Sequence, residues 1–308
     1  MKKYIALILA IAMLFSLTGC GLLVKKVEVT CTCPGCLAAA GGGAQEDSGV
    51  EYKKLEAGSK SGVDCSKLPS DKASVLKLYQ DVANATKAAK NQEVEIIAEG
   101  AKIQVGSITV DETGKALSSA LMGTANKLID SFSPKPETYT CNFVDGKDTN
   151  GNKTGDGEPR TTLNTLPSWD KEYMCDLTDD QVAEATAEEL SDGYWKIKIV
   201  LNEAQCTMTD PATTPDTPHA HCMGTVQSKD LLTDFGGNGT IYFADLAYRD
   251  SGIIAIVDPA SGYLVQLHTD LFMYGDAKMD VKLMSIGKVT AGLEKTTFIN
   301  TYNWSKIS

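Results

Sequence analysis

The segment His219-Ala220-His221-Cys222 and the upstream Cys206 carry the residue types of a transition-metal site. Imidazole and thiolate groups are the ligands that zinc and copper prefer in proteins. The surrounding Pro, Thr and Asp residues predict a loop, in which these side chains are free to converge. The competing interpretation is an exposed polar loop closed by a disulfide. We therefore treat His219, His221, Cys222 and Cys206 as candidate metal ligands, with that alternative open.

Nine cysteines are many for a chain of 308 residues. Eight are left if Cys20 is modified as described below, and four of these are Cys141, Cys175, Cys206 and Cys222. An even number of cysteines in an exported chain favours disulfide bonds. We expect Cys206 to pair with Cys222 and Cys141 with Cys175, because each bond would close one loop-rich insertion, at roughly 3 kcal/mol each by the chain-entropy estimate.

The other cysteines lie nearer the N-terminus, at Cys31, Cys33, Cys36 and Cys65. They include a C-x-x-C, the spacing at which one thiolate attacks a disulfide and the second resolves the mixed disulfide. A redox site would also need a helix N-terminus in a thioredoxin-like frame, whereas Leu, Ala and Gly follow this motif. A four-thiolate zinc site that uses Cys65 is the other alternative, at a spacing outside the usual zinc patterns.

Other chemistry-bearing patterns are incomplete. Asp148, Asn150 and Asn152 alternate as in a calcium loop, but the Gly and Glu that the EF-hand pattern requires further on are missing, which favours a solvated loop. The chain has no G-x-S-x-G, H-E-x-x-H, Walker or G-x-G-x-x-G motif. His268 lies in a predicted strand with no partner recognisable from the sequence. These absences predict a protein that is not an enzyme and that holds no cofactor.

Residues 1–19 have the organisation of a lipoprotein signal peptide. Two lysines precede an apolar run that is shorter than the roughly 20 residues of a membrane span. Leu17-Thr18-Gly19-Cys20 then resembles the lipobox; the alternative is an ordinary secretory signal with a chance cysteine. The resemblance implies cleavage before Cys20, a diacylglycerol on its thiol and an acyl chain, such as palmitate, on the new amine. Two or three chains give a stable anchor, so we expect an extracytoplasmic protein on the cell membrane.

Composition sets the organisation of the remaining chain. Without its leader, which contains Lys2 and Lys3, the chain has 27 basic and 40 acidic side chains, a balance that argues against nucleic-acid binding. Residues 20–66 are expected to be a lipid-anchored flexible tether, rich in Cys, Ala and Gly and poor in apolar side chains that could form a core. Residues 67–308 are expected to form a single soluble domain with a polar loop near 145–160.

Hydrophobic periodicity predicts the elements that position these residues. Helices are expected at 70–92, 114–131 and 179–190, the last because Thr178 and Gln181 have the capping-box spacing. Strands are expected at 94–99, 102–110, 194–201, 240–249, 253–257, 263–274, 279–286 and 297–304. The fold class is therefore α+β, with an antiparallel meander that forms a curved sheet or half-barrel covered by N-terminal helices.

Three segments give the chain a resemblance to known proteins: Leu78-Tyr79 with Ala85-Thr86-Lys87, Leu177-Thr178-Asp179-Asp180-Gln181-Val182, and Asp258-Pro259-Ala260-Ser261-Gly262-Tyr263-Leu264. Together they resemble uncharacterised lipoproteins of anaerobic Gram-positive bacteria, over most of residues 70–304. None of these motifs contains a catalytic residue. The order of elements is more remotely similar to lipoprotein carriers of the LolA and LppX type. That similarity implies a half-open sheet whose covering helices hold lipid acyl chains.

The sequence thus predicts a membrane-anchored lipoprotein that binds or carries a small apolar or lipid ligand without catalysis. An apolar groove is expected between 194–201 and the strands from 240 to 286, because their near-continuous apolar runs suggest burial on both faces. If the second face packs against Trp169, Trp195 and the helices instead, no groove remains. The alternatives are an envelope accessory protein that binds another protein, and a metal-binding or thiol-redox lipoprotein.

Overall fold

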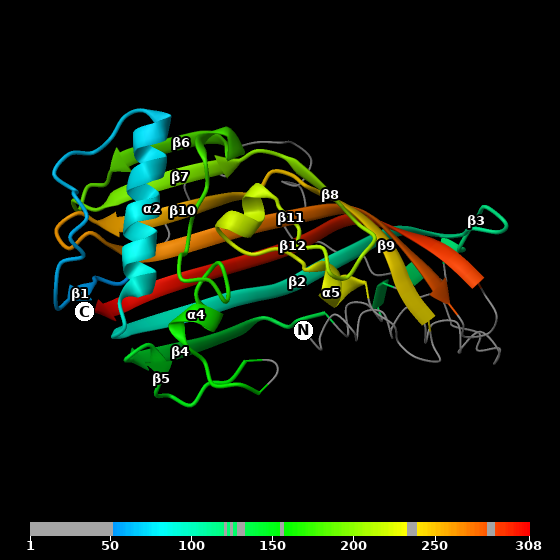
Figure 1. Cartoon of the computed structure of the whole chain (residues 1–308), viewed down its shortest axis with the longest axis horizontal. Helices are drawn as coiled ribbons and strands as arrows, with labels where there is room; N and C mark the ends of the chain where they lie inside the picture. The colour runs from blue at the N-terminus through cyan, green and yellow to red at the C-terminus, as the bar shows by residue number, and fades with distance from the viewer. Residues whose placement is uncertain are drawn as a thin grey trace, which may run out of the picture.

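The computed structural model describes residues 52–119, 122–123, 126–127, 133–154, 157–232, 239–281 and 287–308. The main element of the structure is one large, mainly antiparallel β-sheet that is not closed, and few residues are helical (Figure 1). The predicted leader, Cys20 and most of the predicted tether, with Cys31, Cys33 and Cys36, lie outside the described residues. No helix of the described part is both long enough and apolar enough to cross a membrane.

The strands do not follow one another as a simple meander. Their order across the sheet is β5-β4-β2-β12-β11-β10-β7-β6; β9 pairs with β11 and β8, β3 pairs with β2, and β1 pairs with β12 in parallel. Their bounds are β1 Glu56–Ala57, β2 Gln92–Val110, β3 Lys115–Ala116, β4 Glu137–Val144, β5 Lys147–Asp148, β6 Val182–Glu189, β7 Trp195–Leu201, β8 Ala204–Met208, β9 Gly239–Tyr248, β10 Gly252–Asp258, β11 Tyr263–Val281 and β12 Gly287–Ile307.

Three long strands, β2, β11 and β12, run along the whole length of the sheet, and the strands next to β11 form two separate halves. On one side, β11 pairs with β10 as far as Asp270 and with β9 from Met273 onwards. We call the part with β10, β7 and β6 the proximal half and the part with β9 and β8 the distal half (Figure 1). Gly275 lies at this change of partner with φ of 137°, and a Cβ there would come within 2.0 Å of the Asp245 carbonyl oxygen. Glycine is therefore required where β9 meets β11.

The one long described helix, α2 (Lys72–Ala88), lies across the proximal half of the sheet (Figure 1). Asp71, the second residue of the predicted helix, is its cap and accepts a hydrogen bond from the Ser74 amide at 3.0 Å, and the helix ends four residues before the predicted end. The short helices α4 (Thr162–Thr165) and α5 (Ser228–Leu231) and the 3₁₀ turns η2 (Asp179–Gln181) and η3 (Pro218–His221) come later in the chain. The expectation of an N-terminal helical layer over the whole sheet is therefore wrong.

The segment predicted as a helix at 179–190 is a strand. The capping box of Thr178 and Gln181 is formed, but it starts only the single turn η2. The chain then continues as β6, in which Val182 and Ala185 are buried and most of the other side chains are exposed. Pairing with β7 satisfies this backbone along its length, so tertiary contacts override the local helix signal.

Glycines that were expected to end strands lie inside them instead. The strands predicted at 94–99 and 102–110 are both part of β2, which passes through Gly100 at φ of 79°. At that irregularity the Ala101 amide donates to the Pro134 carbonyl at 3.0 Å. The strand predicted at 263–274 and the start of the strand predicted at 279–286 are likewise both part of β11, while residues 282–286 lie outside the described residues. The second predicted helix, at 114–131, is formed only in part: Lys115–Ala116 form β3, whereas residues 119, 122–123 and 126–127 are helical, and the rest of 120–131 lies outside the described residues.

Part of the predicted tether belongs to the fold. β1 pairs with the end of β12, and the Leu55 side chain is buried in the core. The polar loop near 145–160, in turn, covers the edge of β4: Asp148 accepts a hydrogen bond from the Asn142 amide at 2.9 Å, and the amide groups of Asn150 and Asn152 donate to the Thr140 carbonyl. The residues that alternate as in a calcium loop therefore provide hydrogen-bond partners for the main chain of β4 near the edge of the sheet.

Candidate functional site

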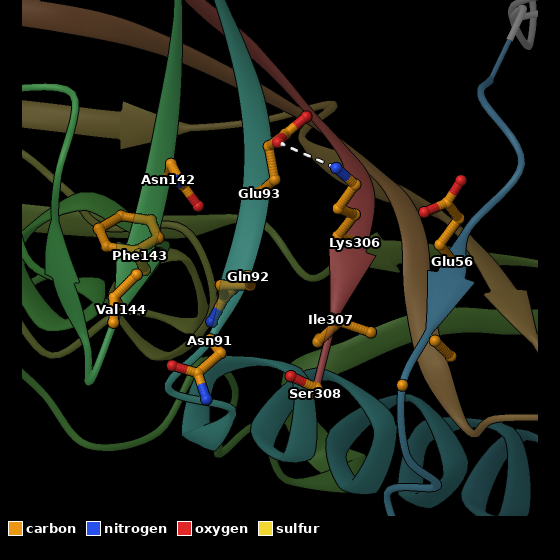
Figure 2. Close-up of a pocket in the computed structure, with 12 residues that line it drawn as sticks. Glu56, Asn91, Gln92, Glu93, Asn142, Phe143, Val144, Lys306, Ile307 and Ser308 are labelled. Carbon is orange, nitrogen blue, oxygen red and sulfur yellow. Dashed lines mark ion pairs between the residues drawn. The ribbon is translucent and has the colours of Figure 1, made fainter.

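A pocket of about 440 Å³ opens where β1, β2, β4 and β12 meet at one end of the sheet (Figure 2). Its volume is within the range of small-molecule sites. Lys306 and Glu93 point toward each other on one side of the pocket, with 3.8 Å between their charged atoms. Asn142 and Val144 of β4 lie on the other side (Figure 2). The residues that line it are Glu56, Ala57, Gly58, Asn91, Gln92, Glu93, Asn142, Phe143, Val144, Lys306, Ile307 and Ser308.

A buried hydrogen-bond network fixes the base of this pocket. The Gln92 side chain accepts a hydrogen bond from the Trp304 indole at 2.7 Å and donates to the carbonyls of Ala89 and Thr86 at 2.5 and 3.2 Å. These bonds tie the end of α2 to the first residue of β2 and to β12. Because a buried polar group that is fully paired resists rearrangement, the base of the pocket is preorganised.

The rim of the pocket combines charge with one apolar contact. Glu93 also accepts a hydrogen bond from the Ser305 hydroxyl at 2.8 Å, so it is held from two sides. Val144, on the opposite side of the pocket, is 48% exposed. The lining residues, all within the described part of the chain, include no histidine or cysteine.

The apolar groove expected from the sequence is not formed by the residues that were expected to line it. Trp195, Ile197 and Ile199 of β7 are buried in the core, and so are most of the apolar residues of β10 and the neighbouring part of β11, including Ile253, Val257, Leu264 and Leu267. None of these residues lines the pocket. The residues expected to line the groove are therefore packed in the core. Trp169, which the alternative interpretation expected to pack against the second face, is 48% exposed.

The predicted metal ligands do not form a metal site. Across the residues that the structure describes, no group of three or more His, Cys, Asp or Glu side chains is arranged to hold a metal ion. His219 is buried and its ring stacks on Tyr248 with 4.9 Å between centroids, while neither of its nitrogens has a hydrogen-bond partner. His221 lies 2.8 Å from both Asp176 and Asp216. The two histidines face different surroundings because η3 turns the chain between them.

The cysteines of the described residues are free thiols: Cys65, Cys141, Cys175, Cys206 and Cys222. The expected bonds from Cys206 to Cys222 and from Cys141 to Cys175 are therefore absent from this structure. Cys141 is a buried residue of β4, and Cys206 is a half-buried residue of β8, in the distal half. Burial is the largest cause that raises the pKa of Cys141 and of Cys175 to about 12, so both thiols are protonated at neutral pH.

His268 has partners that the sequence did not reveal. Its two ring nitrogens lie 2.9 Å from the Thr301 hydroxyl and 3.1 Å from the Asp270 carboxylate. Thr301 is its cross-strand neighbour on β12. The sequence likewise gave no signal for the pocket, because its walls come from four strands that lie far apart in the chain.

A comparison of the chain with protein-family models, with curated proteins and with solved structures finds no match to any of them. The candidate site is therefore described by its geometry alone.

Proposed function

We propose that this protein is an extracytoplasmic lipoprotein, anchored through Cys20, that binds another protein of the cell envelope without catalysis. The observation that supports this function best is the packing of the sheet. The apolar side chains expected to hold a lipid are buried in the core, whereas the pocket at the ends of β1, β2, β4 and β12 is open and has a mixed lining.

The chemistry of this pocket favours a protein partner over a lipid. An acyl chain needs an enclosed apolar cavity, since its transfer from water is driven by the apolar area that is buried. The pocket instead has the exposed Val144 on one side and the charged pair of Glu93 and Lys306 on the other, with amide side chains also in its lining. Protein–protein interfaces combine apolar contacts with polar and charged groups in this way.

Contact through the pocket is tested by photo-crosslinking in cells that export the full chain. A photo-reactive amino acid at Val144 should capture one defined partner, and the same group at Tyr242, an exposed residue of β9 in the distal half, should not. Val144→Asp should weaken binding of that partner about tenfold or more, because it replaces an apolar contact with a charge that the partner would have to desolvate. Equal capture from both positions, or binding that Val144→Asp leaves unchanged, would contradict the proposal.

Lipid extraction of the purified domain, followed by mass spectrometry, separates this function from that of a carrier. We expect no stoichiometric lipid. A bound lipid at one copy per chain would favour the carrier function that the resemblance to LolA-type and LppX-type proteins implies.

The anchor is tested with Cys20→Ser. This variant should be released from the membrane fraction and should not incorporate labelled fatty acid, because the lipid is attached through the Cys20 thiol. A matched Cys36→Ser variant should stay membrane-bound. If Cys20→Ser partitions into detergent and carries label as the unmodified chain does, the anchor assignment is wrong.

A further inference from the structure

Cys175 and Cys222 lie in two segments that the fold fastens together. Cys175 belongs to the segment between α4 and β6, and Cys222 directly follows η3. The Asp176 amide donates to the His221 carbonyl at 3.0 Å. The His221 ring also lies 2.8 Å from the Asp176 carboxylate. Two contacts therefore join the residue after Cys175 to the residue before Cys222.

The two thiols also share one buried environment. Cys175 is 1% exposed and Cys222 is 0% exposed. Burial raises the pKa of the Tyr79 hydroxyl on α2, and Cys175 and Cys222 are the two groups whose charge raises it further. All three residues belong to the same hydrophobic core. Burial raises the pKa of Cys222 above its usual range, and Cys175 raises it further.

The main chain around Cys175 is held in place by α2. The Asn84 side chain accepts hydrogen bonds from the amides of Met174 and Cys175, at 2.8 and 2.9 Å, and donates to the Cys175 carbonyl at 2.9 Å. On the other segment, the Cys222 thiol donates long hydrogen bonds to the Pro218 and His219 carbonyls, at 3.5 and 4.0 Å. These are weak partners for a buried group, so the Cys222 thiol gives up little on forming a bond.

We infer that Cys175 and Cys222 form a disulfide bond in the exported protein. This pairing replaces both bonds expected from the sequence, because the fold brings Cys175 to Cys222. The two thiols lose two protons and two electrons and form one S–S bond. A disulfide-type oxidant accepts the electrons and protons and leaves as two thiols.

The remaining described cysteines lie elsewhere in the fold. Cys141 is in β4, where the Asn152 amide lies 3.8 Å from its sulfur. Cys206 is in β8, and Cys65 lies near Asp258 at the end of β10. We expect that none of them forms a disulfide bond with Cys175 or Cys222.

Burial determines when the bond forms. Thiolate, and not thiol, attacks a disulfide, and burial raises the pKa of both thiols above its usual range. The bond therefore forms while the chain folds, before α2 covers the two segments. Once the chain has folded, the bond should resist reductants that do not unfold the protein.

Peptide mapping of the full exported chain tests this pairing. The protein is purified without reductant, unfolded in the presence of an alkylating agent and digested. A peptide with Cys175 linked to a peptide with Cys222 is expected, together with alkylated Cys141, Cys206 and Cys65. The reduced chain refolded in a mixture of reduced and oxidised glutathione should give the same link. Alkylated Cys175 and Cys222 in both preparations, or links from either residue to another cysteine, would overturn the inference.

Denaturation with and without reductant provides a second measurement. The midpoint should fall when the unmodified chain is reduced, and should not change in the double variant Cys175→Ala and Cys222→Ala. Cys206→Ala, a change at a half-buried thiol outside the pair, should keep the full response. A double variant that still responds to reductant as the unmodified chain does would argue against the bond. If the double variant does not fold, the peptide map decides.

Discussion

His219 and His221 are separated by one residue, yet the fold shifts their pKa values in opposite directions. Burial lowers the pKa of His219 to about 4. For His221, partial burial acts to lower the pKa, but hydrogen bonds with Asp216 and Asp176 outweigh it and raise the pKa. The sequence suggested that both imidazoles serve one metal ion. The structure instead buries the His219 imidazole away from charged groups, and it places the His221 imidazole between two carboxylates.

The buried His219 should make the protein sensitive to acid. Below the unfolded pKa of about 6.5, the unfolded chain binds a proton at this position that the folded chain does not bind until about pH 4. The free energy of unfolding should therefore fall by about 2 kcal/mol between pH 7 and pH 5 from this group alone. His219→Phe, which keeps the ring stacked on Tyr248, should remove that loss in denaturant titrations at the two pH values.

His221→Asn is the matched comparison for this prediction. The pKa of His221 is raised in the folded state, so its contribution is present below pH 6.5 and disappears as the pH rises through the folded pKa. His221→Asn should therefore weaken the protein more at pH 5 than at pH 8. If His219→Phe retains the full loss between pH 7 and pH 5, the burial of His219 is not the cause.

At the scale of elements, α2 holds the long segment between α4 and β6. Gln80, Asn84 and Lys87 lie three or four residues apart on one side of the helix, and each donates to carbonyls of that segment. The Lys87 ammonium donates to the carbonyls of Pro167 and Ser168 at 2.7 and 2.9 Å. Polar side chains at helical spacing therefore provide partners for the main chain of a segment that has little regular secondary structure of its own.

Asn84→Ala should release part of this segment. The change leaves the Met174 and Cys175 amides and the Cys175 carbonyl without their side-chain partner. We expect a loss of roughly 2 kcal/mol in the free energy of unfolding and faster hydrogen exchange at Met174 and Cys175. The matched variant Lys77→Ala removes an exposed pair with Asp81 on the same helix and should cost about 0.5 kcal/mol or less. Similar losses for both variants would mean that Asn84 does not hold the segment.

The sequence predicted elements where local pattern and tertiary pairing agree. Strict alternation identified β7, and the periodicity that begins near Val75 identified α2. The prediction failed at β6, where a real capping box precedes a strand, and at Gly100, where a glycine bends a strand without ending it. In the first case pairing with the neighbouring strand β7 determines the structure, and in the second a hydrogen bond to the carbonyl of a distant loop does so.

At the scale of the whole molecule, distant segments make both the pocket and the proposed disulfide. The pocket joins β1, near the start of the described chain, to the end of β12. The cysteine pair joins two segments that no local pattern relates. The three segments that carry the resemblance also meet at α2: the Lys87 ammonium binds the segment that leads to Leu177, and the Thr86 hydroxyl accepts a hydrogen bond from the Leu264 amide at 3.0 Å. Sequence spacing alone cannot report such proximity.

The three strands that run through both halves of the sheet have a consequence for how the protein unfolds. β11 pairs with β10 of the proximal half and with β9 of the distal half, and Gly275 lets it change its partner without a break. β12 pairs along both parts of β11, and β2 pairs along β12. Neither half can lose these strands and leave the other with a complete sheet. The described fold should therefore melt as one cooperative unit, and its assembly should be slow, because β2 must wait for β12 from the opposite end of the chain.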